Sequence, residues 1–98
     1  MDIQIIPVGF SIKDDLQEFA HNKVSKLERF SDDIISAEVF FRLLNNSEDN
    51  NKCAEIKLLV RGHDLFAKKE SKTFEESLNL AIEALRKQLE KRKDKKKS

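Results

Sequence analysis

The clearest structural signal in the chain is the segment AEIKLLVRGHDLFAKK at residues 54–69. Apolar side chains occupy every second position from Ala54 to Val60, and this period predicts a β-strand with one buried face. Residues 62–64 (Gly-His-Asp) then predict a tight turn, and Leu65–Lys69 predicts a shorter strand that returns beside the first. We therefore expect an antiparallel hairpin in this part of the chain.

Two further strands are predicted upstream of the hairpin. Residues 37–44 alternate in the same way, and the polar segment 45–51 that follows them is too long for a two-residue turn. Near the N-terminus, Asp2–Ile6 predicts a short strand that stops near Pro7 and Gly9, because these residue types interrupt strands. The sheet is therefore expected to contain four strands.

Two segments show the three- and four-residue apolar spacing of amphipathic helices. The first helix is expected to begin after Ser11, with this serine as its N-cap, and to end near Phe30. The second is expected to begin after Thr73, which forms a capping-box pattern with Glu76, and to continue into Arg92.

The order of these elements predicts an α+β fold. A helix between the first two strands makes those strands parallel, whereas the later strands follow one another as antiparallel neighbours. Each helix has one apolar stripe, so we expect both helices to pack on one face of the four-stranded sheet. Residues 1–92 are expected to form a single domain, followed by a basic, frayed C-terminal tail over residues 93–98.

The charge of the chain is almost balanced in total but unevenly distributed. The 98 residues include 19 Lys/Arg and 18 Asp/Glu, so the formal net charge is +1. Residues 1–70 carry ten basic and thirteen acidic side chains, whereas residues 86–98 carry eight basic and two acidic ones. Basic charge is thus concentrated near the C-terminus, where it can attract a polyanion.

The sequence contains no pattern that supports catalysis. The only glycines are Gly9 and Gly62, so there is no glycine-rich phosphate-binding loop. Cys53, His21 and His63 lack the spacing of a zinc site or of an activated nucleophile. We therefore expect a protein that is not an enzyme, with no cofactor, metal or small-molecule substrate.

The sequence also predicts a cytoplasmic protein without a membrane partner. No apolar run approaches the roughly 20 residues that cross a bilayer. The N-terminus lacks the basic start and the apolar stretch of a signal peptide, and a single cysteine suits a reducing compartment.

Basic side chains recur at helical spacing in both predicted helices. Residues three, four or seven apart lie near one another on a helix, so two neighbouring helices can present a broad positive surface. An alternative is that these cations only complement the helix dipoles and form a solvated tail, and spacing alone leaves both interpretations open. The candidate residues are Lys23, Lys26 and Arg29 in the first helix and Arg86, Lys87, Lys91, Arg92, Lys93 and Lys95 in the second.

Three segments of the chain resemble a known family when they are taken in order. They are KVSKLERF at residues 23–30, LLVRG at 58–62 and LRKQLEKRKDK at 85–95. Together with the succession of strands and helices, they resemble the ribosome hibernation promoting factor family, which includes the ribosome-associated inhibitor A proteins. The resemblance covers nearly the whole chain.

This resemblance implies a β-α-β-β-β-α domain similar to double-stranded RNA-binding domains. It also implies a function: binding the small ribosomal subunit at the tRNA/mRNA channel and inhibiting translation under starvation or in stationary phase. We expect a monomer away from the ribosome. By position, the resemblance implies rRNA contacts from Lys23, Lys26, Lys87, Lys91, Arg92 and Lys95, whereas Arg29, Arg86 and Lys93 are added from their spacing alone.

Some features depart from the family pattern. Lys69 stands where the family tends to have a small residue, so the last strand could end early or contribute charge. The chain stops soon after the second helix, so we expect the short form of the family. Two other functions stay open: a generic double-stranded RNA-binding module that acts away from the ribosome, and a protein-interaction domain that uses a sheet face with Phe40, Leu44 and Leu59.

Overall fold

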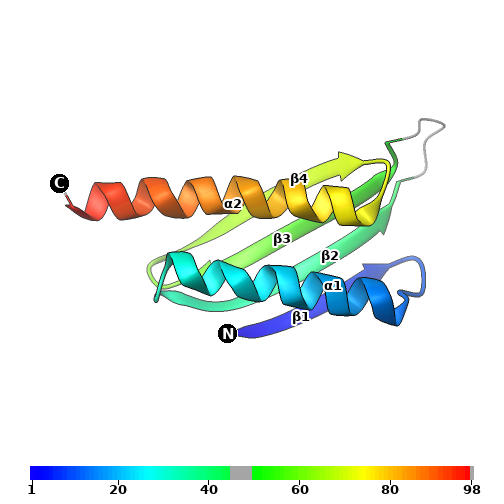
Figure 1. The fold of residues 1–98 in the computed structure, drawn as a ribbon, viewed down its shortest axis with the longest axis horizontal. Coiled ribbons are helices and arrows are strands. Elements are labelled where there is room, and N and C mark those ends of the chain that lie inside the picture. The colour runs from blue at the N-terminus through cyan, green and yellow to red at the C-terminus, as the bar shows by residue number, and fades with distance from the viewer. Residues whose placement is uncertain (45–49, 98) are drawn as a thin grey trace.

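A computed structural model describes residues 1–44 and 50–97, and it describes side chains as far as Lys91. Residues 45–49 of the predicted polar loop lie outside the described part of the chain. The observed order confirms the predicted β-α-β-β-β-α succession (Figure 1). The elements are β1 (Asp2–Val8), α1 (Asp14–Ser25), the 3-10 helix η1 (Lys26–Phe30), β2 (Ile34–Leu43), β3 (Lys52–Val60), β4 (His63–Ser71) and α2 (Phe74–Lys97).

The four strands form one sheet in the order β1-β2-β3-β4. β1 is parallel to β2, and β3 is antiparallel to both β2 and β4, as the sequence predicts. Gly62 connects β3 to β4 with a φ angle of 100°, a left-handed conformation that glycine adopts without steric cost. β1 continues through Pro7 to Val8, and an edge strand tolerates proline because one side of its backbone has no partner strand.

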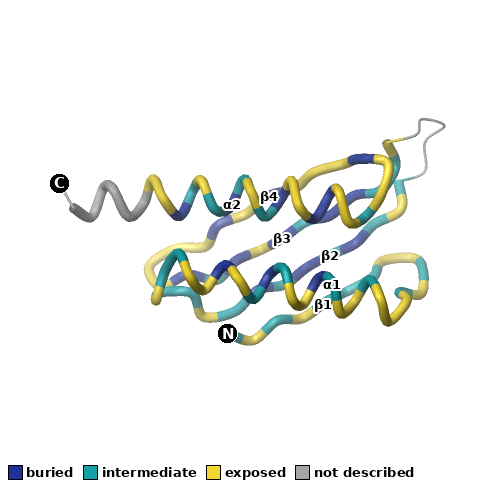
Figure 2. Tube along the Cα trace, viewed as in Figure 1, coloured by how far each residue is buried: buried dark blue, intermediate teal, exposed yellow. Residues whose placement is uncertain are grey.

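Both helices cover the same face of the sheet and enclose the core between them and the strands (Figures 1 and 2). The alternating residues of the central strands point into this core, as their period requires. Phe41 is fully buried, and its ring makes an edge contact with Phe74 at a centroid distance of 5.3 Å. The other large, fully buried side chains include Leu27, Val39, Ile56, Leu58, Leu78 and Leu85.

One of the two predicted helix caps is wrong. α1 begins at Asp14 with Lys13 as its N-cap, no side chain forms a capping hydrogen bond there, and Ser11 lies outside the helix. Asp14 and Asp15 in the first turn complement the positive end of the helix dipole instead. The other cap is confirmed, because the Thr73 hydroxyl accepts a hydrogen bond of 3.1 Å from the backbone N–H of Glu76.

The first helical segment has two parts rather than one. α1 ends at Ser25, and η1 continues the segment to the predicted end at Phe30. The Ser25 hydroxyl donates a hydrogen bond of 2.9 Å to the carbonyl of Asn22, a local contact that competes with α-helical bonding. The last turns therefore follow the tighter 3-10 spacing, which changes how their side chains align.

The end of the sheet also differs from the sequence-based expectation. β4 runs to Ser71 and includes Lys69, so the strand does not end early at this lysine. Lys69 pairs with Ala54 on β3 through its backbone, and its side chain is exposed, so the charge does not have to be buried. The backbone of α2 is helical as far as Lys97. The side chains of residues 92–98 lie outside the described part of the chain, and the predicted fraying of the tail stays a prediction.

A pair of buried serines connects α2 to the sheet. The hydroxyls of Ser71 and Ser77 lie 2.8 Å apart, and the Ser77 hydroxyl donates a hydrogen bond of 2.6 Å to the Lys52 carbonyl on β3. The Ser71 hydroxyl also lies 2.7 Å from the Thr73 carbonyl, so its single proton is within reach of both this carbonyl and the Ser77 oxygen. These bonds satisfy polar groups that would otherwise be buried without partners at the start of α2.

We expect Ser77→Ala to lower the free energy of unfolding by about 1–3 kcal/mol, because it leaves the Lys52 carbonyl without its buried donor. Ser25→Ala is the matched control, since the Ser25 hydroxyl bonds at an exposed position near the end of α1. Urea denaturation of both variants measures the difference. Equal stability of Ser77→Ala and the wild type would show that the serine pair contributes nothing.

Candidate RNA-binding surface

The two helices place their C-terminal ends at the same end of the molecule. α1 and α2 lie side by side and run in the same direction, and η1 also contacts α2 (Figure 1). α2 continues past the end of η1 (Figure 1), so the part of α2 before its last turns is the part that lies beside η1. The basic residues late in each helix therefore share one end of the helical layer.

The α1 side of this surface carries three of the predicted cations. Lys23 is half-buried, and its Nζ lies 5.6 Å from the centroid of the Phe19 ring, an arrangement that favours a cation. Lys26 and Arg29 are exposed in η1. A 3-10 helix has three residues per turn, so Lys26 and Arg29 align on the same side of it. The neighbouring Glu28 pairs with the amino group of Met1 at 3.2 Å.

The α2 side carries Lys87 and Lys91, which are exposed and four residues apart. Their position follows from Gln88, whose Nε2 donates a hydrogen bond of 3.2 Å to the Phe66 carbonyl on β4. Lys91 lies three residues beyond Gln88, so it faces the same flank, and Lys87 lies next to it. The two lysines thus occupy the flank of α2 that is farther from α1.

Arg86 is placed differently from the lysines, because two carboxylates hold it. Its guanidinium donates to both carboxylate oxygens of Glu83, with a distance of 3.1 Å from Nε to Oε2, and to Oε1 of Glu90 at 2.5 Å. The hydrogen bond from Arg86 lowers the pKa of Glu83, and the bond to Glu83 raises the pKa of Arg86 further above its usual range. We name Glu83, Arg86 and Glu90 the carboxylate clamp.

The sequence-based reasoning missed this clamp, although its signal was present. Glu83 stands three residues before Arg86 and Glu90 stands four after it, and both separations bring side chains together on a helix. The other predicted residues Arg92, Lys93 and Lys95 belong to the backbone of α2, but their side chains lie outside the described part of the chain. Their role stays a prediction.

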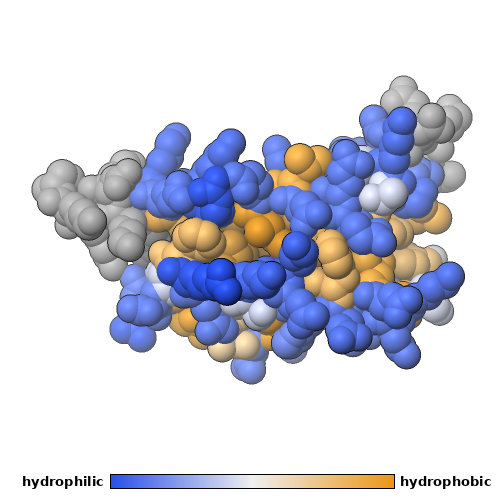
Figure 3. All heavy atoms as spheres, in the orientation of Figure 1, coloured by the Kyte–Doolittle hydropathy of each residue, from blue (hydrophilic) through white to orange (hydrophobic). Residues whose placement is uncertain are grey.

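Among the described side chains, the predicted cations thus lie toward one end of the helical layer in two groups rather than in a single stripe. Figure 3 shows hydrophilic side chains in two bands that follow the two helices, with apolar surface visible between them. The opposite end is acidic, because the first turn of each helix carries carboxylates: Asp14 and Asp15 in α1, Glu75 and Glu76 in α2. The helical layer is thus polarised along its length.

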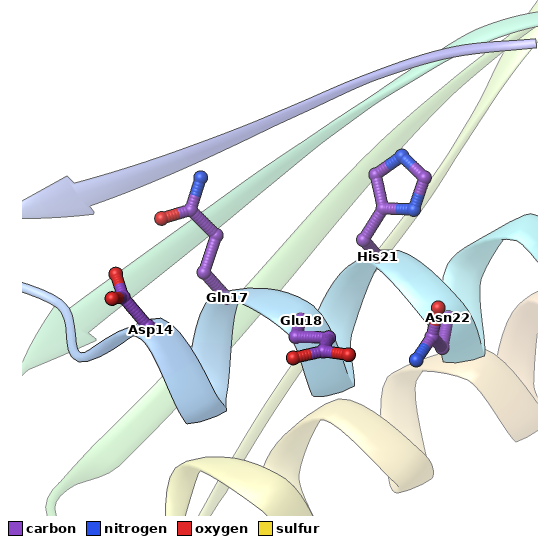
Figure 4. A pocket seen from close by; sticks show the side chains of 5 residues that line it. All are labelled: Asp14, Gln17, Glu18, His21 and Asn22. Carbon is purple, nitrogen blue, oxygen red and sulfur yellow. The ribbon is translucent and has the colours of Figure 1, made fainter.

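A shallow hollow on α1 offers no catalytic arrangement. Its lining residues all come from this one helix, and Gln17 and His21 point to one side while Glu18 and Asn22 point to the other (Figure 4). Within residues 1–44 and 50–91, no group of three or more His, Cys, Asp or Glu side chains could hold a metal ion. Cys53 is buried, and burial raises the pKa of its thiol, which disfavours the reactive thiolate.

The uncovered face of the sheet has mixed chemistry. Phe40 and Leu59 are half-buried there, and the Arg42 guanidinium lies 5.8 Å from the Phe40 ring centroid while pairing with Glu55 at 2.9 Å. Phe66, which the sequence analysis did not single out, is 54% exposed on β4. None of the helices in the described part of the chain is both long and apolar enough to cross a membrane.

The protein is a small α+β domain in which two parallel helices cover one face of a four-stranded sheet. Cations gather toward the C-terminal ends of these helices, and such a surface is suited to binding a polyanion. The chain belongs to the Sigma 54 modulation protein / S30EA ribosomal protein family, whose family model matches residues 3–97. Membership confirms the family that the sequence resembles, and it makes the chain a member of a family of ribosome-associated proteins.

Solved structures show the same fold. The N-terminal domain of Protein Y from Thermus thermophilus is 22% identical, with a TM-score of 0.79 over 93% of this chain and 98% of that domain. A ribosomal subunit interface protein from Coxiella burnetii is 25% identical, with a TM-score of 0.79 over 96% of this chain and 99% of that one. A search of curated protein sequences finds no match to the chain.

Proposed function

We propose that the protein binds the small ribosomal subunit through its rRNA and inhibits translation. The observation that carries this proposal is the gathering of helix-borne cations at one end of a domain that belongs to a ribosome-associated family. The name of the protein from Coxiella burnetii, a ribosomal subunit interface protein, supports the same assignment.

The proposed mechanism is steric. Phosphate contacts hold a compact body at the tRNA/mRNA channel, where it occupies space that tRNA and mRNA need. Lysine and arginine on exposed helix surfaces contact phosphates rather than base edges, so recognition depends on the shape of the folded rRNA. No step requires catalysis, a cofactor or a membrane, and the proposed place of action is the cytoplasm, with the protein monomeric away from the ribosome.

The proposed rRNA contacts fall into two groups. Lys23, Lys26 and Arg29 contribute from α1 and η1, and Lys87 and Lys91 contribute from α2. Arg92, Lys93 and Lys95 extend the second group along the helix axis. Inhibition during starvation or stationary phase fits a protein of this kind, because occupying the channel is useful when translation must pause.

We expect binding to isolated small subunits to weaken steeply with salt. The five contacts from Lys23, Lys26, Arg29, Lys87 and Lys91 alone predict a slope of about −4 for the logarithm of the association constant against the logarithm of salt concentration. Sedimentation of the protein with small subunits over a series of salt concentrations measures this slope. A slope near zero would contradict binding through these cations.

Competition with a short RNA duplex separates the proposed function from a generic double-stranded RNA-binding module. We expect an unlabelled duplex at the concentration of the small subunits to leave the sedimented protein bound, because channel shape contributes to recognition. Unlabelled small subunits should displace the labelled protein. Displacement by the duplex as complete as that by small subunits would favour the generic module.

A further inference from the structure

The carboxylate clamp reverses the local charge of the helix surface at Arg86. Three of the five N–H donors of the guanidinium are bonded to carboxylate oxygens, two to Glu83 and one to Glu90. Arg86 is 31% exposed and the two glutamates are 49% and 50% exposed, so the group lies at the surface. One positive and two negative side chains give the clamp a formal charge of −1.

The clamp lies between the two groups of cations. Gln88 marks the side of α2 that bonds to β4. Arg86 precedes Gln88 by two residues, and each residue of an α-helix is rotated by about 100°, so Arg86 projects about 200° away from that side. It therefore lies on the solvent-facing side toward α1, between Lys87 and Lys91 on the far flank and the cations of α1 and η1. A negative group thus interrupts the surface on which a phosphate backbone is proposed to lie.

Helix stability alone does not account for the second glutamate. An exposed ion pair at three- or four-residue spacing adds little to stability, and one carboxylate already neutralises the arginine. A second carboxylate costs affinity for any polyanion that passes close to it. Such repulsion is a general means of discriminating against unwanted partners, because it acts on every ligand that places charge at that point.

We infer that Glu83 and Glu90 are specificity-determining residues that hold Arg86 away from RNA and disfavour RNA whose phosphates would lie across the gap between the helices. This inference rests on the proposed function, since it assumes that the flanking cations bind RNA. A regular duplex laid along both helices meets the negative group, whereas folded rRNA that contacts the two cation groups separately avoids it. Arg86 is then a partner of the glutamates rather than a direct RNA contact.

The test replaces both glutamates by their neutral isosteres. We expect Glu83→Gln with Glu90→Gln to raise affinity for a short RNA duplex about fivefold and to steepen its salt slope by about 1, because Arg86 becomes free to contact a phosphate. Affinity for small ribosomal subunits should change less than twofold, so the preference for the subunit falls. Fluorescence anisotropy with labelled duplex and sedimentation with subunits provide the two readouts.

The matched control is Glu75→Gln with Glu76→Gln, which makes the same change in net charge in the first turn of the same helix. We expect it to raise duplex affinity less than twofold. An equal rise in duplex affinity in both variants would overturn the inference, because net charge would then explain the rise. The absence of any rise in the clamp variant would also overturn it. Adding Arg86→Gln to the clamp variant should remove the steeper salt slope, and a slope that stays steep would also overturn the inference.

The outcome is separable from that of the proposed function. If the wild-type protein does not sediment with small subunits, the proposed function fails whatever the duplex measurement shows. If the wild type binds subunits but the clamp variant shows no gain for duplex RNA, only the role of Glu83 and Glu90 fails. Circular dichroism of each variant checks that the total helix content is unchanged.

Discussion

Lys87→Glu with Lys91→Glu is expected to weaken binding to the small ribosomal subunit about a hundredfold near 0.1 M salt. Both lysines are exposed on one flank of α2, so the substitutions remove two phosphate contacts and place two negative charges beside the RNA. Because neither side chain is buried, the fold should persist. Co-sedimentation with purified small subunits measures the loss, and circular dichroism checks the fold.

The control for this variant makes the same change of charge at the other end of the helices. Lys13 and Lys72 are exposed just before α1 and α2, and glutamate there is compatible with the positive ends of the helix dipoles. We expect Lys13→Glu with Lys72→Glu to weaken binding less than threefold. If both variants lost binding equally, net charge rather than the proposed surface would govern association. Undiminished binding of the variant with Lys87→Glu and Lys91→Glu would exclude these two lysines as contacts.

Phe41→Ala should lower the free energy of unfolding by about 4 kcal/mol, because a large buried side chain is replaced by a cavity. Phe41 is fully buried on β2 and contacts the ring of Phe74, the first residue of α2. Phe74 in turn stacks on Phe10 with a centroid distance of 5.0 Å. The three rings connect the central sheet, the segment before α1 and the start of α2, so the loss should loosen the helical layer as well.

Phe66→Ala is the matched control for this core substitution. Its ring is 54% exposed on β4, so the same chemical change should cost about 1 kcal/mol or less. Urea denaturation measures the loss in free energy of unfolding of the two variants. An unchanged m-value would show that each loss reflects stability rather than a change in the unfolded state. Equal losses in the two variants would contradict the core described here.

Much of the fold could be predicted because the relevant patterns are local. The alternation from Ala54 to Val60 specifies which side chains face the core, and a shift by one residue would expose all of them. Thr73 was identified as a cap because its hydroxyl needs only the backbone three residues ahead. The Ser11 prediction was wrong because α1 begins three residues later, at Asp14, so that Lys13 rather than Ser11 occupies the N-cap position.

The candidate surface was less predictable, because it depends on how the helices are oriented. Spacing predicted that Lys87 and Lys91 lie together, but the packing of the buried stripe of α2 decides which flank they occupy. The hydrogen bond from Gln88 to Phe66 shows that this flank is the one beside β4. Arg86 was grouped with the lysines because of its helical spacing, and its contacts with Glu83 and Glu90 give it a different environment. A count of charges along the chain does not reveal such pairing.

The sequence by itself was sufficient for the elements, their order and the uneven distribution of charge, because each depends on neighbours within a few residues along the chain. The tertiary structure was needed for the shared end of α1 and α2, the flank that Lys87 and Lys91 occupy and the gap between the two groups of cations. These features depend on which faces of the helices contact the sheet. Such long-range packing follows from the whole core rather than from any one segment.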